Sequence, residues 1–119
     1  MSLKDPEDFN LGEKSEEAKK SDQEFSKLRA RETGDMRKVL SMSEGRRVIW
    51  KLLSEAGIFR DPFNQNSNLT SYALGQKERG LTLLSMVMEA DASAFYQMHR
   101  ESYSEIKSKE KEKQKEEQN

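Results

Sequence analysis

The best candidates for binding chemistry stand close together in the sequence: Arg46, Arg47, Trp50 and Lys51. On a helix, at about 100° per residue, Trp50 would project between Arg46 and Arg47. Guanidinium groups beside an aromatic ring can bind phosphate or stack on nucleotide bases. Alternatively, Trp50 covers the edge of a core while the arginines stay solvated or pair with acidic side chains.

Catalytic chemistry has few candidates. His99 is the single histidine, and its aromatic neighbours favour a packed or capping imidazole over an acid–base role. The carboxylates are spaced as helix caps and surface charges: Glu44, Glu55, Asp61, Glu78, Glu89 and Asp91. There is no cysteine, phosphate-binding loop or metal-ligand spacing, and residues 61–68 lack the closing glutamate of a calcium loop. We therefore expect no catalytic residue, no metal site, no cofactor and no enzymatic activity.

The helix that would carry the arginines and Trp50 is the clearest element of the sequence. Ser43 suits its N-cap, and Gly57 suits a left-handed cap at its C-terminal end. Apolar residues recur between them at helical spacing: Val48, Ile49, Leu52, Leu53 and Ala56. We expect a loop after Gly57, because Pro62 is followed by several Asn and Ser residues.

The loop also contains large apolar residues, Ile58, Phe59 and Phe63, which we expect to pin it onto the core. Because of these large apolar side chains, we extend the binding hypothesis to the loop. The candidate partner-binding residues are Arg46, Arg47, Trp50, Lys51, Phe59, Arg60 and Phe63.

Further helices are expected on both sides of this region. Asp22 can cap a first helix that breaks at Gly34, and Asp35 can then cap a short helix. Residues 70–89 indicate a long helix, in which Gly75 and Gly80 could allow close packing against a neighbour. Its apolar stripe comprises Leu74, Leu81, Leu84 and Met88, widened by Leu83 and Val87. Asp91 begins the next helix, whose expected inward stripe is Phe95, Tyr96, His99, Tyr103 and Ile106.

These elements predict an all-α fold, a small bundle of about four helices with charged, partly disordered N- and C-terminal tails. Residues 1–21 are expected to be a disordered polar tail. Residues 22–106 form the helical domain, with a compact core at about 34–106. Residues 107–119 are nearly all Lys, Glu and Gln, which predicts a charged helical extension or a disordered tail.

Charge and hydropathy restrict the possible partners. Lys and Arg number 21 and Asp and Glu 22, so the net charge of -1 argues against a strongly basic nucleic-acid binder without excluding a local basic patch. No stretch approaches the ~18 consecutive apolar residues of a membrane span. A core of about 70 residues is marginal by itself, so we expect help from a partner or from self-association.

The stretch from Gly34 to Ser102 resembles a small domain family of tailed bacteriophages, named after a protein of a Bordetella phage. The resemblance rests on Asp35–Arg37, Glu44–Arg47 with Trp50, Gly57–Phe63, Gly75–Leu84 and Phe95–Glu101. It covers almost the whole core and neither tail. The family pattern has an Asn-Glu-Gly-x-Arg element before the second long helix, where this chain has the differing sequence Tyr72–Arg79.

The resemblance implies a non-enzymatic protein from the virion and head-assembly gene region of short-tailed phages. We expect a small helical adaptor that binds other phage structural proteins, in the virion and in the host cytoplasm during assembly. One alternative is a nucleic-acid-associated protein, packaged or ejected with the genome, that uses Arg37, Arg46, Arg47 and Arg60. The other is a regulator that binds a host protein.

Overall fold

The computed structural model describes residues 15–118, which fold into four helices with no strand among them. The expected all-α class and helix number are therefore confirmed. The helices are α1 (Glu16–Leu40), α2 (Ser43–Glu55), α3 (Ser67–Ala90) and α4 (Ala92–Gln118). The chain divides into two compact units within α1, between Glu32 and Thr33.

Helix α1 starts earlier than expected and is not interrupted. It begins at Glu16, because the Ser15 hydroxyl accepts a hydrogen bond from the Ala18 N–H at 3.1 Å and acts as a cap. Residues 16–21 are thus helical rather than part of a disordered tail, and residues 1–14 of that tail lie outside the described residues. The helix also passes through Gly34, so the expected break there is wrong. One helical glycine costs only about 1 kcal/mol relative to alanine, which the helix formers around it can offset.

Helix α2 has the expected extent but a different N-terminal cap. Met42 occupies the extended capping position, without a side-chain bond, and Ser43 is already helical. The Ser43 hydroxyl donates instead to the Glu44 carboxylate, at 2.9 Å. The reason is the tight turn after α1, in which the Met42 N–H bonds to the Val39 carbonyl. At the other end Gly57 has a φ of 74°, so the left-handed cap is confirmed.

Helices α3 and α4 both begin at side-chain caps. The Asn66 side chain accepts from the Asn68 N–H, so α3 starts at Ser67, before the expected residue 70. As expected, Asp91 starts α4, where its carboxylate accepts the N–H and the hydroxyl of Ser93 at 3.0 and 2.6 Å. The charged C-terminal segment is helical through Gln118.

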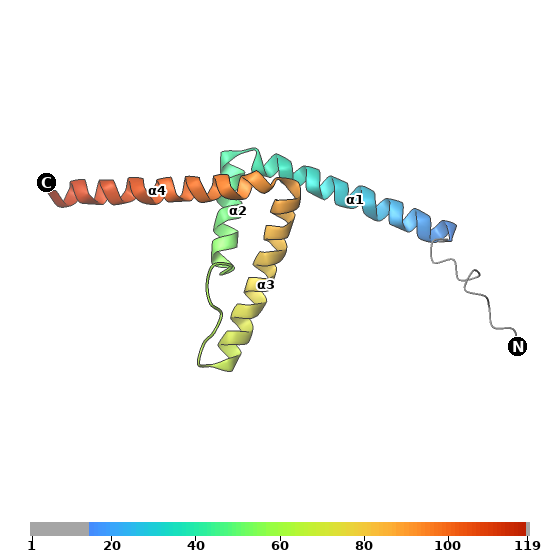
Figure 1. Cartoon of the computed structure of the whole chain (residues 1–119), viewed down its shortest axis with the longest axis horizontal. Coiled ribbons are helices and arrows are strands. Elements are labelled where there is room, and N and C mark those ends of the chain that lie inside the picture. Colours follow the sequence, from blue (N-terminus) through green and yellow to red (C-terminus); the bar gives the residue numbers. More distant parts are fainter. Residues whose placement is uncertain (1–14, 119) are drawn as a thin grey trace, which may run out of the picture. The chain divides into compact units, whose positions relative to one another are not determined.

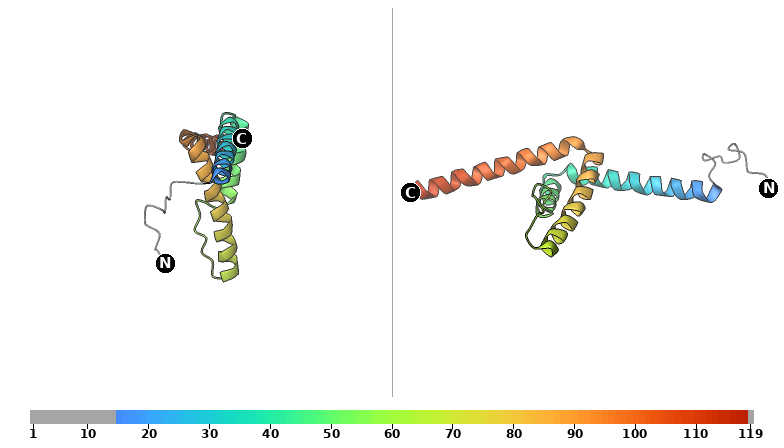
Figure 2. Two further views of the ribbon diagram at one scale, coloured as in Figure 1. Left: turned by 90° about the vertical axis from the view of Figure 1, so that its right-hand side faces the viewer. Right: turned by 60° about the horizontal axis from the view of Figure 1, so that its bottom comes forward.

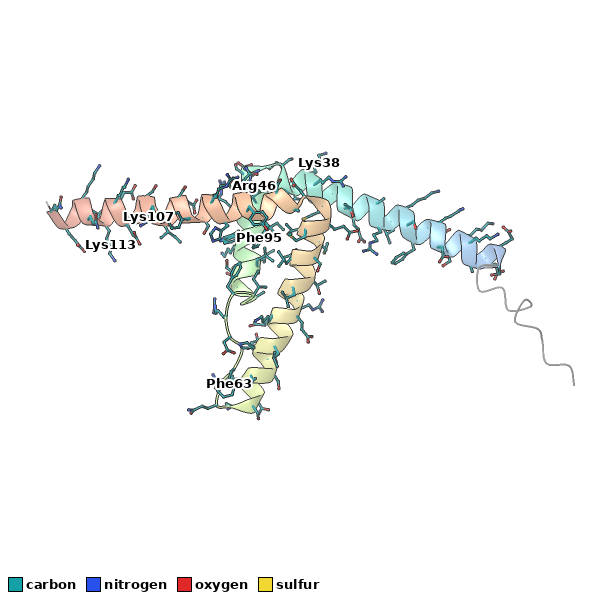
Figure 3. The ribbon with its side chains drawn as sticks, in the orientation of Figure 1. Lys38, Arg46, Phe63, Phe95, Lys107 and Lys113 are labelled. Carbon is teal, nitrogen blue, oxygen red and sulfur yellow. The ribbon has the colours of Figure 1, made fainter. Side chains whose placement is uncertain are left out.

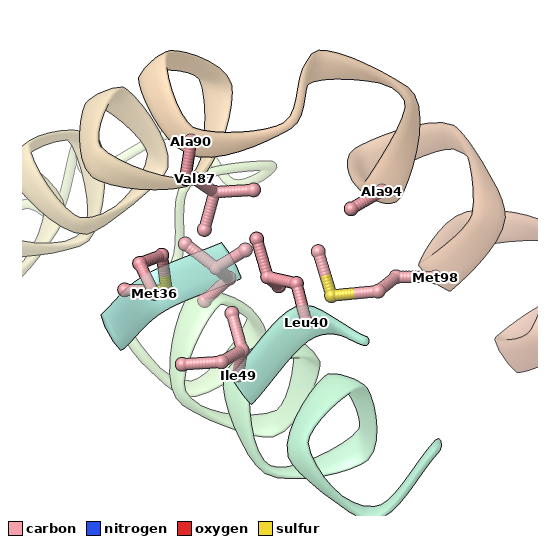
Figure 4. Packing of buried hydrophobic residues seen from close by; sticks show 8 residues of the cluster. Met36, Leu40, Ile49, Val87, Ala90, Ala94 and Met98 are labelled. Carbon is pink, nitrogen blue, oxygen red and sulfur yellow. The ribbon is translucent and has the colours of Figure 1, made fainter. Parts of the chain in front are cut away.

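The second unit, residues 33–119, contains the core. Helices α2 and α3 run side by side in opposite directions, and α4 crosses them near the end that carries Ala90 (Figures 1 and 2). The core collects side chains from all four helices, with the last turns of α1 contributing (Figure 4). Its buried members are Met36, Leu40, Ile49, Leu53, Val87, Ala90, Ala94 and Met98.

Two close backbone approaches hold this core together. A Cβ on Gly45 would lie 2.0 Å from the Val39 carbonyl oxygen, so only glycine lets α2 pass the end of α1. A Cβ on Gly80 would lie 2.6 Å from side-chain atoms of Ala56 and Ile58. The expected close packing at a glycine of α3 is therefore confirmed for Gly80. It is wrong for Gly75, which has open space around it.

The buried faces of α3 and α4 differ from the expected stripes. In α3, Val87 is fully buried, whereas Leu74, Leu81 and Met88 are 40–45% exposed. Helix α4 packs against the core through Ala94 and Met98, because a small side chain and a flexible one permit a close approach to the other helices. Of the expected inward stripe of α4, only Phe95 packs partly against the core. The other members are exposed: Tyr96, His99, Tyr103 and Ile106.

Candidate functional site

Arg46, one of the expected binding residues, joins three elements of the second unit. Its Nε donates to both oxygens of the Glu101 carboxylate on α4, at 3.0 and 3.2 Å, and one terminal nitrogen lies 3.0 Å from the same carboxylate. The other terminal nitrogen donates to the Leu40 carbonyl at the end of α1, at 2.9 Å. With its side chain only 12% exposed, Arg46 is a structural clasp rather than a free binding group.

Arg47 and Lys51 remain on the surface of α2. Arg47 lies 3.9 Å from the Glu44 carboxylate one turn before it, and Lys51 lies 3.9 Å from that of Glu55. All four side chains are more than half exposed, and such pairs contribute little to stability. Their charges are therefore available to an incoming partner.

Trp50 is the centre of an aromatic cluster, which consists of Trp50, Phe59, Phe95, Tyr96 and His99. The Trp50 ring lies 5.6 Å from Phe59, 5.9 Å from Phe95 and 5.8 Å from His99, between ring centroids. Tyr96 packs edge-on against Phe95 at 5.7 Å. Such tilted and edge contacts are the favourable geometries for aromatic pairs.

The aromatic cluster is nevertheless open to solvent. Phe59 is 58% exposed and Tyr96 63%, while Trp50 and Phe95 are half-buried. Figure 3 shows Phe95 beneath α4, in the space between α2 and α3. The cluster therefore combines fixed ring positions with free apolar surface.

A groove of about 560 Å³ lies between α2 and α4 on the other side of Trp50. Trp50 supplies its aromatic surface, the buried Met98 lies at its base, and its α2 side carries Arg47 and Lys51. Glu105 lies on the α4 side. This α2–α4 groove can accept an apolar side chain, and its basic side suits a neighbouring carboxylate.

The remaining expected residues do not all join this site. Phe59 belongs to the aromatic cluster. Arg60 lines a smaller hollow of about 200 Å³ near Gly57 and donates to the Ser54 carbonyl at 3.3 Å. Phe63 lines the same hollow and is 74% exposed, so it does not pin the loop to the core as expected. The Asp61 carboxylate accepts the Phe63 N–H in a tight turn, toward the end of the α2–α3 hairpin that lies away from α4 (Figure 3).

The structure adds groups that were not among the expected site residues. Phe95 supplies ring surface, the buried Met98 lies at the base of the groove, and Glu101 holds Arg46. Phe95 was expected to face inward, and only its helical spacing indicated it. The pairing of Arg46 with Glu101 had no signal in a single sequence.

Two carboxyl groups among the described residues, Glu44 and Asp91, have a pKa below the ordinary value. A hydrogen bond from the Ser43 hydroxyl lowers the pKa of Glu44, and the Ser93 hydroxyl lowers that of Asp91. Both carboxylates lie at the surface, in capping positions or beside them. No cluster of metal-ligating side chains occurs among residues 15–118, and none of the helices described there is long and apolar enough to cross a membrane.

Comparison of the chain with protein-family models, curated proteins and solved structures finds no match in any of the three. The resemblance to the phage domain family therefore rests on the residues quoted above and stays a prediction.

Proposed function

We propose that this protein is a non-enzymatic helical adaptor of a short-tailed bacteriophage, which binds another structural protein through the aromatic cluster and the α2–α4 groove. The observation that carries the binding role is the exposure of aromatic rings that are already held in contact with one another. Rigid aromatic side chains next to a polar rim are typical of binding hot spots. Because the rings are held in place before binding, less entropy is lost on association.

The polar rim indicates what kind of partner segment would fit. Arg47 and Lys51 lie beside the ring of Trp50, and the ion pairs that they form are loose ones on their own helix. A partner segment with one large apolar side chain next to a carboxylate would complement them. Such a segment would exchange weak surface ion pairs for pairs at a partly desolvated interface.

The phage assignment is supported by the resemblance of residues 34–102. Within the stretch Glu44–Arg47 that carries it, Gly45 lets α2 pass α1 and Arg46 clasps α4. This stretch therefore holds Trp50 in position, and the proposed surface depends on it. We place the protein in the virion, and in the host cytoplasm during assembly.

The nucleic-acid alternative is less favoured because two of its four arginines are engaged elsewhere. Arg37 Nε donates to the Ala90 carbonyl at 2.9 Å, and Arg46 holds Glu101. The remaining pair, Arg47 and Arg60, gives few phosphate contacts. Regulation of a host protein would use the same aromatic surface, and no specific observation favours it.

Mass spectrometry of purified virions tests the proposal. We expect the wild-type chain in particles, and a Phe59→Ser variant should be incorporated far less, because it removes an exposed ring of the cluster. Tyr72→Ser is the matched control, since Tyr72 is a 67% exposed aromatic on α3 outside the cluster. Absence of the wild-type protein from particles contradicts the virion role. Equal incorporation of both variants contradicts the role of the cluster.

A further inference from the structure

Helix α4 carries a second apolar surface, separate from its buried face, that shares Tyr96 and His99 with the aromatic cluster. Tyr96, His99, Tyr103 and Ile106 follow one another at spacings of three and four residues, as in the seam of a coiled coil. Tyr96, Tyr103 and Ile106 are 53–63% exposed. The same spacing then reaches Glu110 and Lys113, so the stripe is apolar in its first part and charged in its second.

We propose that this stripe binds a second copy of the chain, with the two α4 helices antiparallel. The stripe is complementary to itself about the midpoint between Tyr103 and Ile106. In that register Tyr103 packs against the partner's Ile106, and this contact occurs twice around the two-fold axis. Two-fold dimers with such self-complementary surfaces are the commonest form of oligomer.

The charged end of the stripe favours this orientation over the parallel one. In the antiparallel register His99 lies opposite the partner's Glu110, and Tyr96 lies opposite the partner's Lys113. A lysine over a tyrosine ring is a favourable cation–π contact, and Lys107 Nζ already lies 5.6 Å from the Tyr103 ring within one chain. A parallel pair would instead place Glu110 against its own copy and Lys113 against its own copy, so like charges would oppose association.

The surroundings of the stripe indicate how stable the dimer should be. On one flank Arg100 would face the partner's Lys107, and this repulsion at the solvent rim weakens the pair. On the other side His99 contacts Trp50, so the partner's Glu110 would lie close to the aromatic cluster. We therefore expect a reversible dimer whose formation changes the fluorescence of Trp50, the single tryptophan of the chain.

Sedimentation equilibrium of the full chain measures the association. We expect the wild type to form dimers as concentration rises, and Ile106→Gln, which replaces the apolar side chain with a neutral polar one, to stay monomeric with an unchanged helical circular dichroism signal. Ser108→Gln is the matched control, because Ser108 is exposed on α4 outside the stripe, and it should dimerise like the wild type. A wild type that stays monomeric at every concentration would overturn the proposal. So would a dimer that survives Ile106→Gln.

Cysteine cross-linking determines the orientation, since the chain has no cysteine of its own. A mixture of Tyr96→Cys and Lys113→Cys chains should form a disulfide between the two variants upon oxidation. Neither variant alone should cross-link well, because in the antiparallel register each position lies roughly 26 Å along the helix from its own copy. Efficient cross-linking of either variant with itself contradicts the antiparallel register. Ser104→Cys mixed with Glu105→Cys is the control, since these positions point away from the stripe and should not cross-link.

Discussion

Arg46 and Glu101 form a forked ion pair between α2 and α4, in which the arginine Nε reaches both carboxylate oxygens at 3.0 and 3.2 Å. The two residues lie 55 positions apart in the chain. The Arg46 side chain is 12% exposed and that of Glu101 37%, so the pair is better shielded than the other ion pairs of α2. Arg46 also donates to the Leu40 carbonyl, and its charge therefore satisfies two acceptors at once.

Replacing Arg46 should destabilise the second unit. Arg46→Ala leaves the Leu40 carbonyl and the Glu101 carboxylate without their donor, which should lower the free energy of unfolding by about 2 kcal/mol. Arg46→Lys should recover only part of this, because an ammonium group cannot reproduce the planar fork. Urea denaturation followed by circular dichroism measures both changes.

Arg47→Ala is the control for this prediction, since Arg47 lies on the same helix and pairs only at the surface. Its effect should stay within about 0.5 kcal/mol. Equal losses for the two alanine variants would show that Arg46 does not act as a clasp.

Two glycines of the second unit should respond in opposite ways to alanine. Gly45→Ala would bring a Cβ to 2.0 Å from the Val39 carbonyl oxygen, so α2 must move away from α1. We expect a loss of about 2 kcal/mol, typical of overpacking. Gly75→Ala fills open space within α3 and should stabilise by up to about 1 kcal/mol. Thermal unfolding of the two variants checks the signs, and a stabilising Gly45→Ala would mean that the helices do not approach closely there.

Periodicity and caps predicted much of this fold. Ile49 and Leu53 were placed correctly on the apolar face of α2, and Gly57 at its left-handed cap, because these features depend on neighbours along the chain. The early start of α1 was missed, although Ser15 before a run of Glu, Ala and Lys was a usable capping signal.

The buried face of α4 could not be chosen from the sequence. The helix has two apolar stripes, and the size of the side chains predicts that the stripe from Tyr96 to Ile106 faces inward. The structure buries Ala94 and Met98 instead, because close helix approach favours small and flexible residues over rings.

For the candidate site, Trp50 and Phe59 were found from residue type alone. The ion pair between Arg46 and Glu101 could not be predicted from the sequence, because it depends on how distant helices pack.

The Asp91 carboxylate caps the start of α4, and its contribution to stability should depend on pH. The Ser93 hydroxyl bond, followed by the backbone N–H bonds of Ser93 and Ala94 and the charge of Arg37, lowers the pKa of Asp91 below its ordinary value of 3.8. A carboxyl group with a lowered folded pKa stabilises the fold above its unfolded pKa, and that stabilisation is lost as the pH falls through the folded value. The wild type should therefore lose this contribution only below about pH 4. Asp91→Ala should be less stable at pH 7 and should differ less from the wild type at pH 2. Urea midpoints of both proteins across this range measure the effect, and a stability difference that stays constant with pH would contradict it.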